Sequence, residues 1–387
     1  MLKKVDLIAV FEKACKPKRA FRIGVEHEQF VLRSDNTRVP YSGKSGIKEL
    51  LLFFKQFGYD KSLHENGKLI GLYDPITKQS ITLEPGGQFE LAGAPLKTVD
   101  EVRSEIALHF KRLDAASKTL GISFLATGFD PYNTRDSVPW MPKERYNIMR
   151  SYMPTVGTMG LDMMTRTCTV QVNLDYSSER DMVRKMRVGM ALQPLVAAYF
   201  AQSTMVEGKD SGYKQYRTLV WQNTDPARSG ILPFVFDDDF GFERYVDYLL
   251  DLPMYFIKRD GQYYDMAGQS FVDFMNGILP GFEGDFATLS DFDDQISIAF
   301  PEVRLKRFIE LRGADGGDAD HIMAVTSFWV GLFYNDAALD AAFDIVKHWT
   351  YEDVLDVYKR VPQEGANAMI HGKSIVEWMR VLSPPSS

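Results

Sequence analysis

The sequence predicts an α+β fold with a large core and without the common nucleotide-binding glycine motifs. Strand-like and helix-like segments follow one another in an uneven order, unlike the regular alternation of a parallel βαβ fold. The hydrophobic share of 45% is sufficient for a large core in a chain of 387 residues. Neither a Walker loop nor a dinucleotide-binding glycine fingerprint is present. No clear linker interrupts the chain, so we expect one domain over residues 1–387.

The first two predicted elements are a helix and an unusually polar strand. Charged residues interrupt the apolar part of residues 1–20, so this segment predicts an amphipathic helix rather than a secretory signal. Residues 21–32, FRIGVEHEQFVL, alternate like a half-buried strand, yet Glu26, His27 and Glu28 occupy the centre.

Two covering helices and a bent strand follow. The apolar spacing in residues 47–58 and 99–121 fits helices that a glycine closes. Between them, residues 79–93 have β-rich flanks around a Pro-Gly-Gly sequence, which predicts a bent or bulged strand.

The second half of the chain contains the clearest strand. Residues 166–176, RTCTVQVNLDY, alternate polar and β-branched side chains, and a helix over residues 179–201 should follow. Residues 304–317 predict another short strand that ends in a glycine-rich turn, and residues 321–349 are typical of a helix. The longest apolar stretch, residues 190–201, is shorter than the ~20 residues that span a membrane, so we expect no transmembrane segment.

Charge and cysteine content restrict the class of partner. A net charge of −7 without a long basic run argues against nucleic acid and membrane surfaces and favours small molecules. An acidic chain can still gather arginines in one cleft to bind anions. Cys15 and Cys168 are too few for a disulfide framework and lack the spacing of a zinc site, so we expect a cytoplasmic protein.

Carboxylates on one strand face point to a metal site. Because strand side chains alternate, Glu26 and Glu28 share a face and His27 points away. The two carboxylates repel each other unless a cation or solvent compensates, and Mg²⁺ prefers oxygen ligands together with water and substrate phosphates. The same sheet face could collect further oxygen donors from later segments, namely Glu84, Gln88, Glu90, Gln171 and Asn173. The pattern therefore predicts metal-bound nucleotide and phosphoryl transfer.

Each of these features also has a purely structural explanation. Glu26 and Glu28 could form the solvated face of an edge strand. The Pro-Gly-Gly sequence fits a turn, His27 fits a buried supporting residue, and Cys168 fits a packed strand residue. The occurrence of several polar strands together favours the functional interpretation.

Longer strings of the sequence resemble one enzyme family. The plant-type glutamate–cysteine ligases, also found in many proteobacteria, have strings similar to IGVEHEQF, ITLEPGGQFELAGAP, VGTMGLDMMTRTCTVQVNLDYSSE, GILPFVFDD and PEVRLKRFIELRGADGG. The match also includes LQPLVAAYFAQS and WVGLFYNDAAL, and it runs in the family's order from about Phe21 to Ala338.

The resemblance implies both a fold and a reaction. The fold would be a curved, mainly antiparallel sheet of the glutamine-synthetase type, covered by helices. The reaction would join the γ-carboxylate of L-glutamate to the amine of L-cysteine through γ-glutamyl phosphate, with ATP converted to ADP and phosphate, as the first step of glutathione biosynthesis. Mg²⁺ would be the cofactor, the partners would be the substrates glutamate, cysteine and ATP, and we expect a monomer or homodimer.

The resemblance also implies roles for individual residues. Metal ligation would fall to Glu26, Glu28, Glu84 and Glu90, and catalysis to Glu26, Glu28, Glu84 and Arg312. Nucleotide and cofactor binding would fall to Gln88, Gln171, Asn173 and Glu310. Substrate binding would fall to Arg166, Arg217, Trp221 and Arg228, and Arg166, Arg228 and Arg312 rank highest among the arginines. As alternatives, Arg217 could be a surface residue and Trp221 a core anchor.

Some features depart from the family pattern. The family's WTDTD appears as WQNTD, which retains Trp221 and Asp225, and two cysteines in all argue against the thiol switch of plant members. Residues 339–387 contain no matching string, so we expect a divergent or shortened helical C-terminal segment of a single catalytic domain. A related ligase with another amine acceptor and a noncatalytic binding homologue are the alternative functions.

Overall fold

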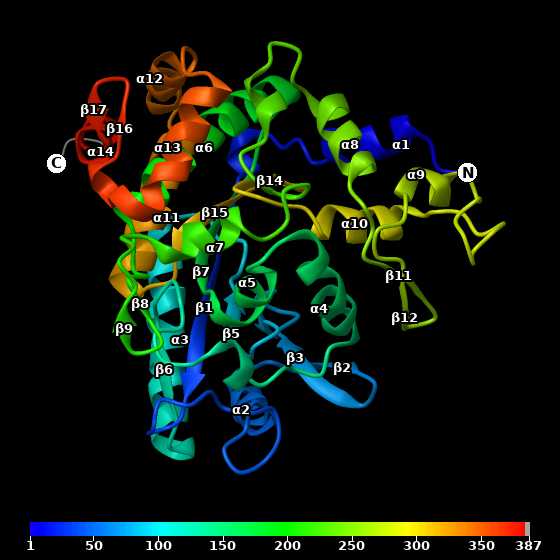
Figure 1. Ribbon diagram of the computed structural model, residues 1–387, viewed down its shortest axis with the longest axis vertical. Coiled ribbons are helices and arrows are strands. Elements are labelled where there is room, and N and C mark those ends of the chain that lie inside the picture. Colours follow the sequence, from blue (N-terminus) through cyan, green and yellow to red (C-terminus); the bar gives the residue numbers. More distant parts are fainter. Residues whose placement is uncertain (384–387) are drawn as a thin grey trace.

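The computed structural model describes residues 1–383 and has the predicted α+β fold, with helices over a large sheet (Figure 1). The largest sheet has nine strands in the order β14-β15-β7-β1-β5-β4-β3-β2, and β6 pairs with the last residues of β1. Every pair of neighbours in this sheet is antiparallel. Its strands are β1 (Ile23–Leu32), β2 (Lys61–Glu65), β3 (Lys68–Tyr73), β4 (Ser80–Leu83), β5 (Phe89–Ala92), β6 (Ser123–Leu125), β7 (Thr169–Leu174), β14 (Val303–Leu305) and β15 (Ile309–Asp315).

Helices and four small two-stranded sheets complete the described chain. The helices are α1 (Lys4–Glu12), α2 (Ile47–Phe54), α3 (Val99–Leu120), α4 (Glu144–Val156), α5 (Gly160–Arg166), α6 (Glu179–Tyr199), α7 (Tyr216–Gln222), α8 (Phe242–Asp251), α9 (Phe271–Met275), α10 (Leu289–Ser297), α11 (Ala319–Tyr334), α12 (Asp336–Val346), α13 (Tyr351–Glu364) and α14 (Ile375–Leu382). The small sheets pair β8 (Met205–Val206) with β9 (Lys209–Asp210), β10 (Ser229–Gly230) with β13 (Phe300–Pro301), β11 (Phe256–Arg259) with β12 (Gln262–Asp265), and β16 (Met369–Ile370) with β17 (Lys373–Ser374).

One face of the main sheet is apolar and lies against helices. Val25 of β1 and Val170 and Val172 of β7 are buried in the same core cluster as residues of α3, α6 and α11. These three helices contact β1, β15 and β7. Because strand side chains alternate, the polar residues of the same strands lie on the opposite face.

The position of β1 decides between two interpretations of its carboxylates. This strand lies between β5 and β7, and Glu26 is opposite Ala92 on one side and Gln171 on the other. Glu28 is paired with Glu90 of β5. The edge-strand explanation of Glu26 and Glu28 is therefore wrong, because β1 is an inner strand of the sheet between β5 and β7.

Several predicted boundaries change because the chain reverses direction. Residues 79–93 form an antiparallel pair, β4 and β5, rather than one bent strand, and the Pro-Gly-Gly sequence is the turn between them. Residues 304–315 lie in the β14–β15 hairpin rather than in one short strand. The predicted helix over residues 321–349 is two helices, α11 and α12, with a bend of 91°. The closing glycine of α3 is confirmed at Gly121, whose φ is 66°.

Three helices make up most of the described C-terminal segment. Helices α12, α13 and α14 lie beside α6 (Figure 1). The last four residues of the predicted segment, 384–387, lie outside the described residues. Among residues 1–383 no single helix is long and apolar enough to cross a membrane. The bent α11–α12 pair together has the length and apolar composition of a membrane span, but only by those two criteria.

Candidate active site

A cavity of about 250 Å³ lies over the polar face of the main sheet. Strands β1, β5, β7, β14 and β15 form one wall, and α4, α5 and α7 contribute to the facing wall. Its charged and amide-bearing lining residues are Glu26, Glu28, Glu84, Gln88, Glu90, Arg145, Gln171, Arg217, Arg304 and Arg312. The cavity thus brings carboxylates and arginines from distant parts of the chain together.

The four predicted metal carboxylates all line this cavity, and neighbouring groups hold three of them in place. The Glu26 carboxylate accepts hydrogen bonds from Asn173 Nδ2 at 2.7 Å and Gln171 Nε2 at 3.3 Å. Glu28 Oε2 accepts from the Thr169 backbone N–H at 3.1 Å. Glu90 accepts from the Thr82 hydroxyl, its neighbour on β4.

Crowding and burial change the charge of two of these carboxylates. Burial raises the pKa of Glu28 well above its usual range, and the Glu84 and Glu90 carboxylates raise it further. Burial, then Glu84 and Glu26, raise the pKa of Glu90 to about 8. A cation bound among the carboxylates would offset the repulsion that contributes to both shifts.

The cluster offers suitable ligands for Mg²⁺ without a complete coordination shell. Among residues 1–383, no three His, Cys, Asp or Glu side chains already stand in an arrangement that could hold a metal ion. Mg²⁺ commonly takes only one or two protein carboxylates and completes its shell with water and substrate phosphates. The all-oxygen donor set and the raised pKa values of Glu28 and Glu90 are consistent with such an ion.

Arg312 and Arg304 reach the cavity from the β14–β15 hairpin. Glu310, which is fully buried beneath them, accepts from Arg304 Nε at 2.6 Å and from Arg312 Nη1 at 2.8 Å. Burial alone would raise the pKa of Glu310, but Arg304, Lys306 and Arg312 hold it well below its usual range. Glu310 does not line the cavity, and it anchors two arginines that do.

Helix α7 supplies Arg217 and Trp221 to the facing wall. Arg217 is buried and donates to the carbonyls of Gly313 and Arg312 at 3.2 and 3.1 Å, so the surface-residue alternative is wrong. The indole Nε1 of Trp221 is buried without a hydrogen-bond partner in the described part of the chain. An unpaired buried donor in a cavity wall is available to a bound polar ligand.

Two predicted substrate arginines lie elsewhere. Arg166 pairs with Asp162 at 3.0 Å and with Glu207 at 3.1 Å. Arg228 pairs with Asp225 at 2.6 Å and stacks over the Tyr255 ring. Neither arginine lines the cavity, because buried carboxylates hold both of them at other places. Of the three arginines ranked highest in the sequence, only Arg312 therefore lines the cavity.

The predicted amide residues differ in how they contribute. Gln171 lines the cavity and bridges Glu26 to Arg312. Asn173 contacts Glu26 from outside the lining. Gln88 lines the cavity, but its Nε2 donates to the carbonyls of Met164 and Thr167, so it mainly joins two backbone segments.

Two cavity arginines were missed in the sequence. Arg304 faces Glu310 across the β14–β15 hairpin, and that pairing could have been found by recognising the hairpin in RLKRFIEL. Arg145 comes from α4, and no local pattern separates it from a surface arginine.

His27 is buried on the opposite face of the sheet, and its ring centroid lies 5.1 Å from that of His109. This position fits the supporting role that the alternation of strand side chains indicates for His27.

Comparisons with known proteins agree with this geometry. The family model described as glutamate-cysteine ligase family 2 matches residues 22–380. Chloroplastic glutamate–cysteine ligase A of Oryza sativa subsp. japonica is 50% identical over 365 residues, which cover 94% of this chain and 73% of that protein. The chloroplastic enzyme of Nicotiana tabacum is 49% identical over 364 residues, covering 94% and 69%.

A solved structure has the same fold. The glutamate–cysteine ligase of Francisella tularensis, crystallised in complex with AMP, matches with a TM-score of 0.55 over 94% of this chain and 76% of that chain. The sequence identity is 12%, so this likeness concerns the fold alone.

The comparisons correct the predicted location. A cytoplasmic protein was expected from the low cysteine content, but the curated relatives at about half identity are chloroplastic enzymes. The cytoplasmic prediction is therefore wrong, because cysteine content reports the redox state of a compartment and does not identify the compartment.

Proposed function

The chain belongs to the glutamate–cysteine ligase family 2, and on this premise we propose how its cavity carries out the ligation. The chain is a glutamate–cysteine ligase, and its reaction is the first step of glutathione biosynthesis. The clustering of four carboxylates and four arginines in one cavity is the observation that carries the mechanism proposed below.

The chemistry requires activation of a carboxylate. The γ-carboxylate of glutamate is a poor acyl donor, because an oxygen must leave when the amide forms. We propose that it attacks the γ-phosphorus of ATP, which releases ADP and gives γ-glutamyl phosphate. The cysteine amine then attacks the acyl carbon, the C–O bond to phosphate breaks, and the amine proton passes to the departing phosphate.

The carboxylate cluster is proposed to hold Mg²⁺ together with ATP. Glu26, Glu28, Glu84 and Glu90 would provide oxygen ligands, and Gln171 and Asn173 would keep Glu26 oriented. Bound Mg²⁺ would neutralise charge on the phosphate oxygens. The raised pKa values of Glu28 and Glu90 support this role, because each carboxylate gains a compensating charge when the ion binds.

The arginines are proposed to hold the anionic groups that react. Arg145, Arg217, Arg304 and Arg312 line the cavity opposite or beside the carboxylates, and guanidinium groups bind carboxylate and phosphate oxygens in a forked geometry. Placing two anions in line and offsetting their charge lowers the barrier of phosphoryl transfer. The free Trp221 Nε1–H supports an additional contact with a substrate carboxylate.

An isotope experiment tests the order of these steps. Glutamate labelled with ¹⁸O in its γ-carboxylate is supplied with cysteine, ATP and Mg²⁺, and the released phosphate is analysed by mass spectrometry. Transfer of one labelled oxygen to phosphate is expected, because the acyl phosphate carries that oxygen away. Stoichiometric dipeptide and ADP without labelled phosphate would refute the acyl-phosphate route.

We further propose that residues 1–387 act as one catalytic domain and that the enzyme is a monomer or homodimer. Light scattering on the purified protein distinguishes these two states from larger assemblies.

A further inference from the structure

The turn that carries Glu84 has nearly all of its backbone polar groups engaged. The Gly87 N–H donates to the Glu84 carbonyl at 2.8 Å, and the Glu84 N–H donates to the Gln88 carbonyl at 3.0 Å. The Pro85 carbonyl accepts from the Met141 N–H at 2.8 Å. The turn is therefore fixed from several sides, which sets the position of Glu84 on the cavity wall.

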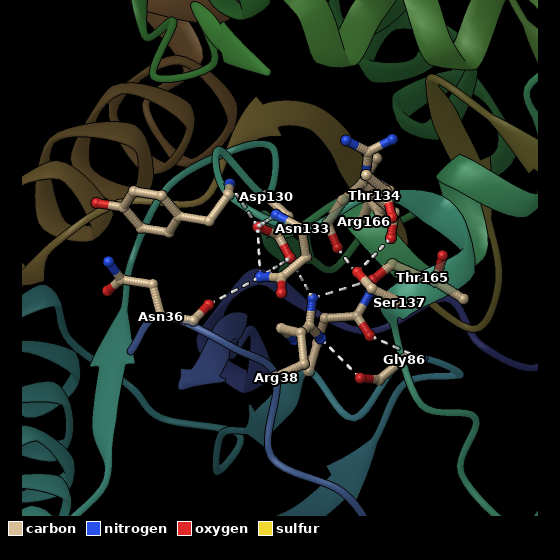
Figure 2. Close-up of polar contacts among 12 residues, drawn as sticks. Asn36, Arg38, Gly86, Asp130, Asn133, Thr134, Ser137, Thr165 and Arg166 are labelled. Atoms are coloured by element: carbon tan, nitrogen blue, oxygen red, sulfur yellow. Dashed lines mark hydrogen bonds and ion pairs between the residues drawn. The ribbon is translucent and has the colours of Figure 1, made fainter. Parts of the chain in front are cut away.

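Arg38 supplies one of these attachments from outside the cavity. Its Nη2 donates to the Gly86 carbonyl at 2.7 Å, and its Nη1 donates to the Thr165 carbonyl at 3.2 Å (Figure 2). The same Nη1 pairs with Asp130 Oδ2 at 3.0 Å. One guanidinium thus joins the Glu84 turn to the last turn of α5, a helix that also contributes to the cavity.

The two backbone segments that Arg38 joins are in direct contact. A Cβ atom added at Gly86 would lie 2.5 Å from the Thr165 carbonyl oxygen. The carbonyls of Gly86 and Thr165 are both acceptors, so a donor is needed where they converge. The forked guanidinium meets this need with two N–H directions, whereas an ammonium lacks the fixed geometry.

Asp130 holds Arg38 in this orientation. The side chains of Arg38 and Asp130 are 1% and 0% exposed, so solvent does not screen their attraction. Asp130 also accepts from the backbone N–H groups of Tyr132 and Asn133 at 2.9 and 3.0 Å. Figure 2 shows Asn133 beside Asp130. The Arg38 guanidinium stacks over the Phe30 ring at 4.6 Å.

We propose that Arg38, oriented by Asp130, is a positioning residue for the ligation. It fixes the Glu84 turn against Thr165 and thereby places Glu84 for the metal-bound nucleotide. This inference rests on the metal role proposed for Glu84, and neither Arg38 nor Asp130 lines the cavity.

Two substitutions disturb this attachment in different ways. Arg38→Lys keeps the charge opposite Asp130 but removes the fork that reaches both carbonyls. Gly86→Ala leaves Arg38 intact and pushes the turn away from Thr165, because the added Cβ has no room. The matched control is Arg187→Lys, because Arg187 also stacks on a phenylalanine and donates to a backbone carbonyl, at Trp349, away from the cavity.

Metal affinity and amide exchange provide readouts that do not depend on turnover. Mn²⁺ is titrated into each protein with a non-hydrolysable ATP analogue and followed by electron paramagnetic resonance. Peptides that cover residues 84–88 are followed by hydrogen–deuterium exchange. We expect Arg38→Lys and Gly86→Ala to weaken Mn²⁺ binding by about 10- to 100-fold and to speed exchange of the turn. Arg187→Lys should change neither.

The outcomes separate this inference from the metal role beneath it. If Arg38→Lys bound Mn²⁺ with wild-type affinity, the positioning role would be overturned and the metal role of Glu84 would stand. If the lysine variant does not fold, the same result in Gly86→Ala would have this meaning. Weaker Mn²⁺ binding with unchanged amide exchange of residues 84–88 would also overturn it, because the turn would not have moved. A wild-type protein that binds no Mn²⁺ would remove the metal role itself and this inference with it.

Discussion

Glu28 is the cavity carboxylate with the strongest reason to lose its charge. It is buried, it pairs across the sheet with Glu90, and burial together with Glu84 and Glu90 raises its pKa. Its only hydrogen-bond donor among residues 1–383 is the Thr169 N–H. Such a site tolerates a neutral side chain better than an unpaired charge, so the carboxylate is explained by function rather than stability.

Replacing Glu28 by glutamine should separate folding from activity. The amide keeps the shape and can still accept from Thr169, so the free energy of unfolding should equal or exceed that of wild type. Turnover of ATP should fall at least about 10-fold at limiting Mg²⁺, because an anionic ligand is lost. Turnover against Mg²⁺ concentration and urea unfolding measure the two effects.

The control for this substitution is Glu105→Gln. Glu105 is a buried carboxylate of α3 that accepts from the Ala94 N–H at 2.8 Å and does not line the cavity. Its variant should keep the wild-type dependence on Mg²⁺. Unchanged turnover of Glu28→Gln at limiting Mg²⁺ would argue against a metal role for Glu28.

Glu90 should make stability depend on pH when no metal is present. Its pKa rises from 4.5 to about 8 on folding, so between these values the folded chain binds a proton that the unfolded chain has lost. The contribution of Glu90 to the free energy of unfolding is complete below about pH 4.5. It is lost as the pH rises towards 8, at up to about 1.4 kcal/mol per pH unit. Glu28 acts in the same direction.

Thermal unfolding in a chelator between pH 5 and pH 8.5 measures this dependence. Glu90→Gln should flatten the curve, because the amide does not titrate. Added Mg²⁺ with ATP should stabilise the wild type more at high pH than at low pH, because the ion binds the deprotonated carboxylates. An identical curve for wild type and Glu90→Gln would show that Glu90 does not carry the effect.

Helix α13 links the C-terminal segment to the cavity. The Tyr358 hydroxyl donates to Glu302 Oε1 at 2.8 Å, and Glu302 lines a small recess with Arg217, Trp221 and Arg312. The Gln222 amide at the end of α7 donates to the Tyr358 carbonyl at 2.6 Å. One turn of α13 therefore supports the helix that presents Arg217 and Trp221.

Tyr358→Phe should weaken this support. Loss of a hydrogen bond to a buried carboxylate should cost about 1–3 kcal/mol in the free energy of unfolding. The KM for glutamate should rise more than kcat falls, because the substitution disturbs substrate contacts rather than the metal carboxylates. Denaturant unfolding and steady-state kinetics measure both quantities.

Tyr351→Phe is the matched control on the same helix. The Tyr351 hydroxyl has no hydrogen bond in the described chain, and its ring lies near Phe236, away from the cavity. If Tyr358→Phe and Tyr351→Phe had the same free energy of unfolding and the same KM for glutamate, the hydrogen bond from Tyr358 to Glu302 would make no measurable contribution.

The chain as a whole should show no thiol-dependent regulation. Cys15 is half-buried and Cys168 is fully buried, and both are free thiols. Burial raises the pKa of each thiol, which lowers the fraction of reactive thiolate. Ligase activity should therefore be the same in oxidant and reductant, for wild type and for Cys15→Ser and Cys168→Ser. An activity change abolished by either substitution would contradict this prediction.

Much of the fold could be predicted because its signals are local. The alternation in residues 21–32 and 166–176 and the glycine that ends α3 depend only on near neighbours in the chain. The errors arose at reversals, where residues 79–93 became the β4–β5 pair and residues 321–349 became two helices. A reversal depends on what the chain packs against, and a single segment does not contain that information.

The sequence by itself determined the family, the α+β class and the shared face of Glu26 and Glu28, because strand alternation and long matching strings are properties of the linear chain. Only the tertiary structure decided which charged groups meet. Arg166 is bound by Asp162 and Glu207, whereas Arg304 is turned into the cavity by Glu310. Similar arginines thus differ in role, because the position of a long, flexible arginine side chain depends on which buried carboxylate the fold brings beside it.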